Sequence, residues 1–302
     1  MDQTPVPGPR FPRRRMLQLT GIAAGLTAVA PSACTAPPPV PDVSRPATTA
    51  STPTPSPSPV RPSIVSTRRG AFVSRFRPSV TTRWSMALPL PQQANQLLPV
   101  AVFLHGRGGS SDILLRELAA HRALQRYLDD GGTPFGIAAV DGGNSWWHAR
   151  TDGTDTQSML VLEFLPFLAE QGFDLGKVAL FGISMGGFGA LLLASLGKVN
   201  GLRAVAAMSP AIWPTYQTGM PGAFDSPADF AANNVFPLRP RLAATPTWVD
   251  CGSEDALAPK VRAYRSGLPG RVEGAIGPGG HNMTYWRSVL PDVLDFMGRS
   301  LG

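Results

Sequence analysis

A serine between closely spaced glycines is the part of this sequence best suited to covalent chemistry. Ser184 is the centre of Gly-Ile-Ser-Met-Gly, residues 182–186, which follows the apolar run 177–181 and precedes a helical pattern. Glycines on both sides of a serine let the chain turn sharply from a strand into a helix and expose the hydroxyl at the strand end. The motif predicts a nucleophile that attacks a carbonyl carbon; the alternative is a glycine-rich turn without a chemical role.

A serine hydroxyl is a weak nucleophile, so this chemistry needs a general base within hydrogen-bond reach and a third group that orients the base. Of the four histidines in the chain, His281 comes last, in a Gly-Gly-His-Asn loop after the final strand pattern, and is the candidate base. His121 lies in an arginine-rich helical pattern and is expected at the surface. His105 opens the loop His-Gly-Arg-Gly-Gly, which is expected to frame an oxyanion hole rather than to supply a base.

The third group should come from a segment with three carboxylates that stands between the serine and the histidine. Asp250 belongs to a strand pattern, so the pleat fixes its direction, whereas Asp255 lies beyond Gly252, where the chain can turn toward the histidine. Glu254 is expected to point elsewhere. We therefore predict that Asp255 orients His281; the alternative is that Asp255 only caps the helix that follows.

Aromatic residues gather in the segments that follow the predicted strands, and they suggest a pocket beside the serine. Aromatic walls with few polar groups suit a fatty acyl or aryl group, although packing of these loops onto the core is an equal alternative. Residues 211–236, with their glycines and prolines, are the candidate lid. The predicted pocket residues are Trp146, Trp147, His148, Trp213, Tyr216 and Trp286.

The elements that must position these residues alternate along the chain after residue 70. Short apolar strands separated by helices predict a mostly parallel sheet with helices on both faces, preceded by an antiparallel hairpin. The strand patterns cover residues 71–76, 82–88, 100–104, 136–140, 177–181, 204–208, 247–250 and 272–276. The helical patterns cover residues 114–127, 157–169, 185–196 and 285–297.

The charge of the chain is concentrated in its first 69 residues. A net charge of +7 and a pI near 10.1 would ordinarily favour nucleic acid or an anionic surface as a partner. Eight arginines and two acidic residues stand in residues 1–69, so residues 70–302 retain a net charge of only +1. Nucleic-acid binding is therefore excluded as the function of the folded part.

The first 66 residues have the composition of an export signal followed by a stalk. Residues 1–33 place three consecutive arginines before an apolar run, as a twin-arginine signal does, and the run is shorter than the roughly 20 residues that span a bilayer. Cys34 follows Pro-Ser-Ala, which looks like a lipoprotein box; a lipid anchor at Cys34 and ordinary secretion are equal alternatives, and both place the mature chain outside the cytoplasmic membrane. Residues 34–66 are rich in Pro, Ser and Thr and are predicted to be a disordered stalk. Residues 67–302 are left for the folded domain.

The motifs taken together resemble the esterase D family, which also contains S-formylglutathione hydrolases, feruloyl esterases and secreted mycolyltransferase antigens. The resemblance covers residues 68–302. It implies an α/β-hydrolase fold with a single catalytic domain and a triad of Ser184, Asp255 and His281. It also implies that the backbone amides of Met185 and Arg107 form the oxyanion hole. The motifs that carry it are His-Gly at 105–106, Asp-Gly-Gly-Asn-Ser-Trp-Trp at 141–147, Gly-Ile-Ser-Met-Gly-Gly-Phe-Gly-Ala at 182–190, Asp-Cys-Gly-Ser-Glu-Asp at 250–255, Gly-His-Asn at 280–282 and Tyr-Trp at 285–286.

These residues predict hydrolysis of carboxylic esters, of acyl lipids or aryl groups, through an acyl-serine intermediate. Two alternatives stay open: an acyltransferase that resembles the mycolyltransferases, in which only the acceptor differs, and a surface binding protein on a degenerate hydrolase scaffold. No cofactor or metal ion is expected, because the histidines are scattered and Cys34 is far from Cys251 in the sequence. Cys251 is expected to pack in a buried strand.

Overall fold

The computed structural model describes residues 64–90 and 97–302, which belong to one compact unit. The predicted export signal, Cys34 and residues 34–63 of the predicted stalk lie outside the described residues. Within the described part, every helix is too short or too polar to cross a membrane.

A mixed sheet forms the centre of the unit, with the strand order β1-β2-β4-β3-β5-β6-β7-β8 and with β9 paired to β7. β1, β2 and β4 are joined by antiparallel pairing, whereas the other neighbouring strands are parallel. The predicted fold class is thus confirmed, with its initial antiparallel hairpin. The strands are β1 Ile64–Val73, β2 Thr81–Leu90, β3 Leu98–Leu104, β4 Gly136–Val140, β5 Phe173–Ile183, β6 Leu202–Met208, β7 Thr247–Gly252, β8 Val272–Glu273 and β9 Ile276–Gly277.

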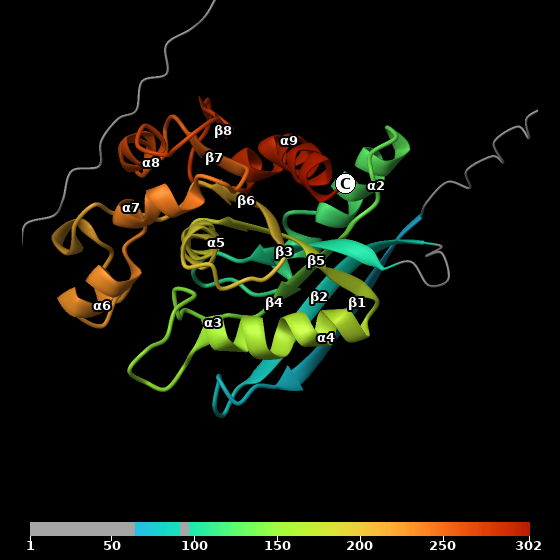
Figure 1. The fold of residues 1–302 in the computed structure, drawn as a ribbon, viewed down its shortest axis with the longest axis horizontal. Helices are drawn as coiled ribbons and strands as arrows, with labels where there is room; N and C mark the ends of the chain where they lie inside the picture. Colours follow the sequence, from blue (N-terminus) through green and yellow to red (C-terminus); the bar gives the residue numbers. More distant parts are fainter. Residues whose placement is uncertain (1–63, 91–96) are drawn as a thin grey trace, which may run out of the picture. The chain divides into compact units, whose positions relative to one another are not determined.

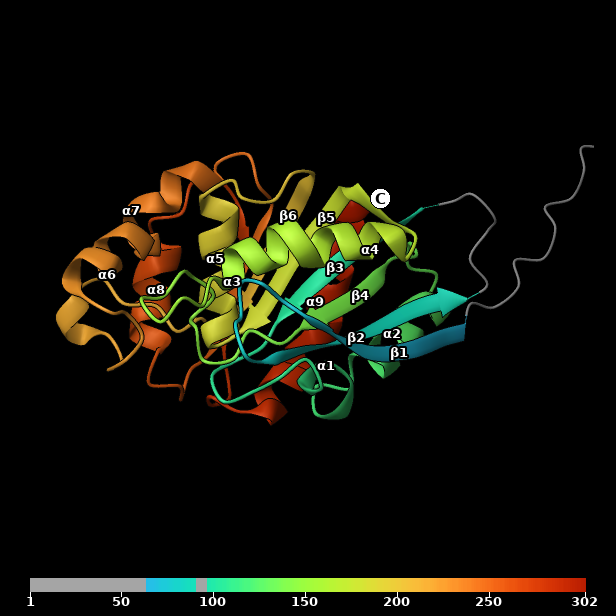
Figure 2. The ribbon, with the colours of Figure 1, turned by 90° about the horizontal axis from the view of Figure 1, so that it is seen from below.

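Helices cover both faces of the sheet, with α2 and α9 on one face and α4 and α5 on the other (Figures 1 and 2). The sheet interior is therefore apolar on both sides: in β3, Val102 points into the core under α5, whereas Phe103 points into the core under α9. This explains why the central strands read as continuous apolar runs. The α-helices are α1 Ile113–Arg116, α2 Ala120–Asp129, α3 Thr156–Met159, α4 Leu165–Glu170, α5 Met185–Ser195, α6 Pro227–Asn233, α7 Val235–Leu238, α8 Ala258–Arg265 and α9 Met283–Leu301.

Several elements differ from the sequence prediction, and α6 and α7 have no counterpart among the predicted helical patterns. β1 begins at Ile64, inside the predicted stalk, because residues 64–66 pair with the end of β2. The helix predicted at residues 114–127 is broken into α1 and α2, since Ala119 adopts a left-handed conformation with φ of 51°. The last predicted strand is divided into β8 and β9 at Gly274, which has a positive φ of 79°.

Candidate active site

Three side chains from separate loops form one hydrogen-bonded line at the carboxyl ends of the parallel strands. The Nε2 atom of His281 lies 2.9 Å from Ser184 Oγ, and its Nδ1 atom lies 2.6 Å from Asp255 Oδ2. Ser184 follows β5, Asp255 follows β7, and His281 lies between β9 and α9. The structure thus brings together the three residues that their order in the chain singles out. The arrangement can remove a proton from the serine and stabilise the imidazolium that results.

A sharp turn between β5 and α5 exposes Ser184. The serine has a φ of 53° and a ψ of −118°, outside the regions that an L-residue prefers. A Cβ atom at Gly186 would overlap the carbonyl oxygen of Leu104, so only glycine fits there. The Ser184 carbonyl accepts hydrogen bonds from the amides of Phe188 and Ala211, both at 3.0 Å. The neighbouring chain therefore holds the strained residue in place.

Asp255 is held as a carboxylate in a site where it is only 4% exposed. Burial opposes its ionisation, but hydrogen bonds from His281 and from the backbone amide of Leu257 outweigh this effect and lower the pKa of the carboxyl. The Asp255 carbonyl also accepts a hydrogen bond from Ala258 at the start of α8. Asp255 therefore contacts the histidine, and the alternative that it only caps the following helix is wrong, because the N-cap of α8 is Leu257 and no side chain caps that helix.

The two neighbouring carboxylates have other surroundings. Asp250 is 1% exposed in β7 and accepts hydrogen bonds from Trp248 Nε1 at 2.5 Å and from the Tyr285 hydroxyl at 3.1 Å. Burial raises the pKa of Asp250 to about 6. Glu254 is exposed at the pocket rim. Of the three carboxylates, Asp255 is the one in contact with His281.

The predicted oxyanion donors belong to two segments, the start of α5 and the loop after β3. Met185 is the first residue of α5, where backbone amides lack helical partners and the helix dipole favours negative charge. Arg107 lies in the loop after β3, and it lines the same cavity as Gly106 and Ser184. These two amides remain the predicted donors to an oxyanion formed at a carbonyl bound to Ser184.

A cavity of about 540 Å³ opens beside Ser184 and His281. Of the predicted pocket residues, Trp146, Trp213 and Trp286 line it. Its other walls are mostly apolar, with charged side chains at four positions, Arg107, Glu117, Glu254 and Asp255. The lining residues that the sequence analysis did not assign to the site are Gly106, Ile113, Glu117, Ile183, Ala211, Met220, Glu254, Ala256, Leu257 and Met283.

Trp147, His148 and Tyr216 do not line this cavity, so their assignment to the pocket is wrong for this structure. Trp146 and Trp147 both have positive φ angles, 60° and 55°, and this double turn buries the second ring, which donates through Nε1 to the His105 carbonyl at 3.2 Å. Tyr216 packs instead on Phe230. The sequence does not indicate that two successive tryptophans adopt the left-handed conformation, so it could not show which ring faces the cavity.

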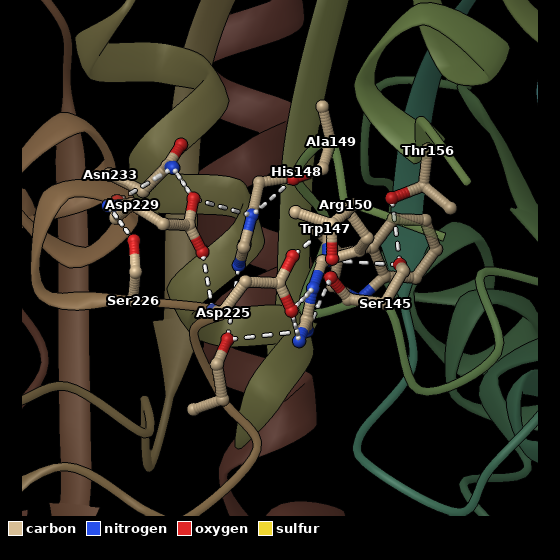
Figure 3. A network of polar contacts seen from close by, with 12 residues as sticks. Ser145, Trp147, His148, Ala149, Arg150, Thr156, Asp225, Ser226, Asp229 and Asn233 are labelled. Carbon is tan, nitrogen blue, oxygen red and sulfur yellow. Dashed lines mark hydrogen bonds and ion pairs between the residues drawn. The ribbon is translucent and has the colours of Figure 1, made fainter. Parts of the chain in front are cut away.

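His148 does not reach the cavity and belongs instead to the polar network of Figure 3. The histidine is fully buried: its Nε2 atom is 3.1 Å from the Ala223 carbonyl, and its Nδ1 atom is 3.6 Å from Asp229. Beside it, Arg150 forms an ion pair with Asp225 at 2.5 Å. These contacts fasten the candidate lid to residues 145–151. Sequence reasoning missed them because the partners are 75 residues or more apart.

Comparisons with known proteins bear on the family and on the fold. The model of the Esterase family, described as "Putative esterase", matches residues 79–297. Curated protein sequences gave no match. Among solved structures, a ferulic acid esterase has a TM-score of 0.68 at 21% identity and covers 79% of this chain and 99% of its own.

Two further solved structures share the fold at lower identity. An S-formylglutathione hydrolase from Agrobacterium tumefaciens has a TM-score of 0.63 at 17% identity and covers 78% of this chain and 95% of its own. A fluorophosphonate-binding serine hydrolase from Staphylococcus aureus has a TM-score of 0.60 at 15% identity, and the coverage is 78% and 98%. At these identities the likeness shows the α/β-hydrolase fold.

Proposed function

The chain belongs to the Esterase family and is a carboxylic ester hydrolase, and from that premise we propose that it works through an acyl-serine intermediate on Ser184. The observation that carries the proposal is the continuous line from Ser184 through His281 to Asp255, with distances of 2.9 and 2.6 Å. A serine in this arrangement is activated by its neighbouring base, as nucleophilic catalysis requires.

In the proposed reaction, Ser184 Oγ forms a bond to the ester carbonyl carbon while His281 Nε2 takes the hydroxyl proton. The amides of Met185 and Arg107 stabilise the resulting oxyanion. The carbon–oxygen bond to the alcohol then breaks, and His281 returns the proton to the departing oxygen. Water attacks the acyl-serine by the reverse sequence and releases the acid. Asp255 keeps the imidazole in the tautomer that leaves Nε2 free to accept.

The substrate that we propose carries an apolar acyl or aryl group. Trp146 and Trp213 lie with ring centroids 5.3 Å apart on one wall, and the Trp286 ring stands edge-on to His281 at 5.1 Å. Such walls bind flat or aliphatic groups and offer few polar partners. Hydrolysis is the proposed outcome; transfer to an alcohol acceptor is the alternative, because the acylation half-reaction is the same.

The test uses the full chain with a chain-length series of p-nitrophenyl esters and a fluorophosphonate probe. We expect Ser184→Ala to lose probe labelling and nearly all turnover, with an unchanged melting temperature, because a single hydroxyl is removed. Ser266→Ala, at an exposed position after α8, is the matched control and should behave as the wild type. Near-normal turnover in Ser184→Ala would overturn the proposal. Partition of the acyl group to glycerol or a sugar in preference to water would favour the transferase.

We also propose that the protein is exported, on the basis of the three-part pattern of residues 1–33. Lipidation of Cys34 and cleavage without lipid remain the two routes. The intact mass of the mature chain separates them, because diacylation adds two fatty chains to an N-terminal Cys34.

A further inference from the structure

His105 is completely buried beneath the active site, and both of its ring nitrogens have partners. The backbone amide of Gly142 donates to Nε2 at 2.9 Å, so Nε2 carries no proton. The proton is therefore on Nδ1, which donates to the Gly106 carbonyl at 2.8 Å. Burial lowers the pKa of this imidazole, which keeps the ring neutral. With both nitrogens in use, His105 is not a base for the reaction.

The hydrogen bond from His105 fixes the direction of one peptide group. The Gly106 carbonyl receives two donors, His105 Nδ1 at 2.8 Å and the Gly109 amide at 3.1 Å. A trans peptide is planar, so its C=O and the following N–H point in opposite directions. Holding the Gly106 carbonyl against His105 therefore turns the Arg107 N–H away from the imidazole.

The Gly106–Arg107 peptide borders the cavity that contains the nucleophile. Gly106, Arg107 and Ser184 line the same cavity. A Cβ atom built on Gly106 would lie 3.5 Å from Ser184 Cβ, so this peptide group borders the serine directly. Rotation of the peptide by even a modest angle would move the donor away from the position of a developing oxyanion.

We propose that His105 is a positioning residue that sets the orientation of the Gly106–Arg107 peptide and thereby forms one half of the oxyanion hole. This inference rests on the proposed acyl-serine reaction. His105 itself touches neither substrate nor Ser184; it acts through the carbonyl that it holds.

The segment Asp-Gly-Gly-Asn-Ser-Trp-Trp, residues 141–147, supports the same loop at further points. The Gly108 amide donates to Asn144 Oδ1 at 2.7 Å, and the Ser111 amide donates to Asp141 Oδ1 at 2.6 Å. Gly142 fixes the tautomer of His105, as described above. Residues 141–147 thus hold the oxyanion loop in place through hydrogen bonds. The motif in the sequence does not indicate these contacts.

Two substitutions separate the two hydrogen bonds of the ring. An Asn side chain places its amide nitrogen near the position of Nδ1, so His105→Asn keeps a donor for Gly106; a Gln amide reaches the position of Nε2, so His105→Gln keeps a partner for Gly142 instead. His105→Phe keeps the ring volume and loses both bonds. We expect kcat to fall about a hundredfold in His105→Phe and to be partly restored by Asn but not by Gln, with KM little changed.

A second measurement distinguishes positioning from general loosening of the fold. Trifluoromethyl ketones form a tetrahedral oxyanion on the serine, and their affinity should fall in parallel with kcat/KM across the three variants, whereas affinity for the product acid should not. His121→Asn, on α2 and outside the cavity, is the matched control and should show no change. If His105→Phe is unfolded, the kcat values and inhibitor affinities of His105→Asn and His105→Gln still test whether the bond to Gly106 positions the peptide.

The inference is overturned if a folded His105→Phe keeps kcat and inhibitor affinity near wild type, or if Gln equals or exceeds Asn. Either result leaves the proposed function intact as long as Ser184→Ala is inactive. Conversely, an active Ser184→Ala variant would remove the proposed function itself, so the two failures are distinguishable.

Discussion

Different interactions hold the floor and the roof of the cavity in place. The floor consists of the segments that carry Gly106, Ser184, Asp255 and His281, and it depends on close backbone approaches and on short hydrogen bonds made by the buried side chains of Asp255 and His105. The roof is the candidate lid, residues 211–236, and it is fastened to residues 145–151 by side-chain pairs such as Arg150 with Asp225, which are 12% and 20% exposed.

This difference separates the residues that the reaction requires from the residues that determine which substrates bind. A change in the floor displaces a reacting group or leaves a buried charge without a partner, so it costs catalysis or folding. A change in the roof alters the Trp213 side of the cavity but leaves the hydrogen-bonded line intact. Substrate preference should therefore be adjustable in the roof without loss of the chemistry.

The largest effect is expected at the floor, where the three carboxylates can be tested one against another. Asp255→Asn should lower kcat by about ten-thousand-fold, because an amide no longer stabilises the imidazolium and favours the wrong tautomer. Glu254→Gln, at the rim, is the matched control and should change kcat little. Turnover and melting temperature measured in parallel check both. An active Asp255→Asn beside a folded but inactive Glu254→Gln would reverse the assignment.

A smaller effect is expected at the roof. Arg150→Met removes the ion pair with Asp225 and the hydrogen bonds to the carbonyls of Gly222 and Ala223, so the roof should become looser. KM for long-chain or aryl esters should rise about tenfold, equivalent to about 1.4 kcal/mol of binding, while kcat for a short acetyl ester should hold. Arg203→Met, at the start of β6 where the side chain donates to the Gly176 carbonyl, controls for the loss of a surface arginine. A fall in kcat for the acetyl ester would show that floor and roof are not separable.

The smallest effect on turnover is expected at Asp250, whose role is in stability. Its folded pKa of about 6 lies above the ordinary 3.8, so the protonated carboxyl favours folding. That contribution is full below pH 3.8 and is lost as the pH rises through 6. Asp250→Asn cannot ionise, so its free energy of unfolding relative to wild type should rise between pH 4 and pH 7 by about 1–3 kcal/mol.

Urea unfolding of both proteins at several pH values measures this difference. The comparison with wild type cancels the other carboxyls, such as Asp141, whose lowered pKa acts in the opposite direction. A constant difference across this pH range would mean that Asp250 stays ionised in the folded protein.

The floor could be predicted from the sequence because local rules determine most of it. The turn at Ser184 needs glycines at fixed positions, and the order of serine, acid and histidine follows from the order of the strands. The choice of Asp255 over Asp250 followed from the side of Gly252 on which each residue lies. The same reasoning placed His105 in the oxyanion loop but gave no indication of its hydrogen bonds.

The roof could not be predicted in this way, because its contacts join residues far apart in the chain. Neither Arg150 nor Asp225 carries a local signal, and only the folded chain brings them together. The burial of Trp147 depends on two consecutive positive φ angles, which the aromatic composition of the segment does not reveal. Patterns in the sequence thus indicate which residues are apolar, but not which of them face the cavity.

The position of β1 has a practical consequence for attaching the enzyme to a support. β1 is the edge strand where the described domain begins, and in the strand order it stands four places from β5, which leads into Ser184. At the usual spacing of about 4.8 Å between neighbouring strands, the two lie about 19 Å apart across the sheet. A bead, surface or fused carrier joined ahead of Ile64 therefore meets the domain at the side away from the nucleophile. Immobilisation through this end should leave the mouth of the cavity open to bulky esters, whereas coupling through exposed residues of the roof would obstruct it.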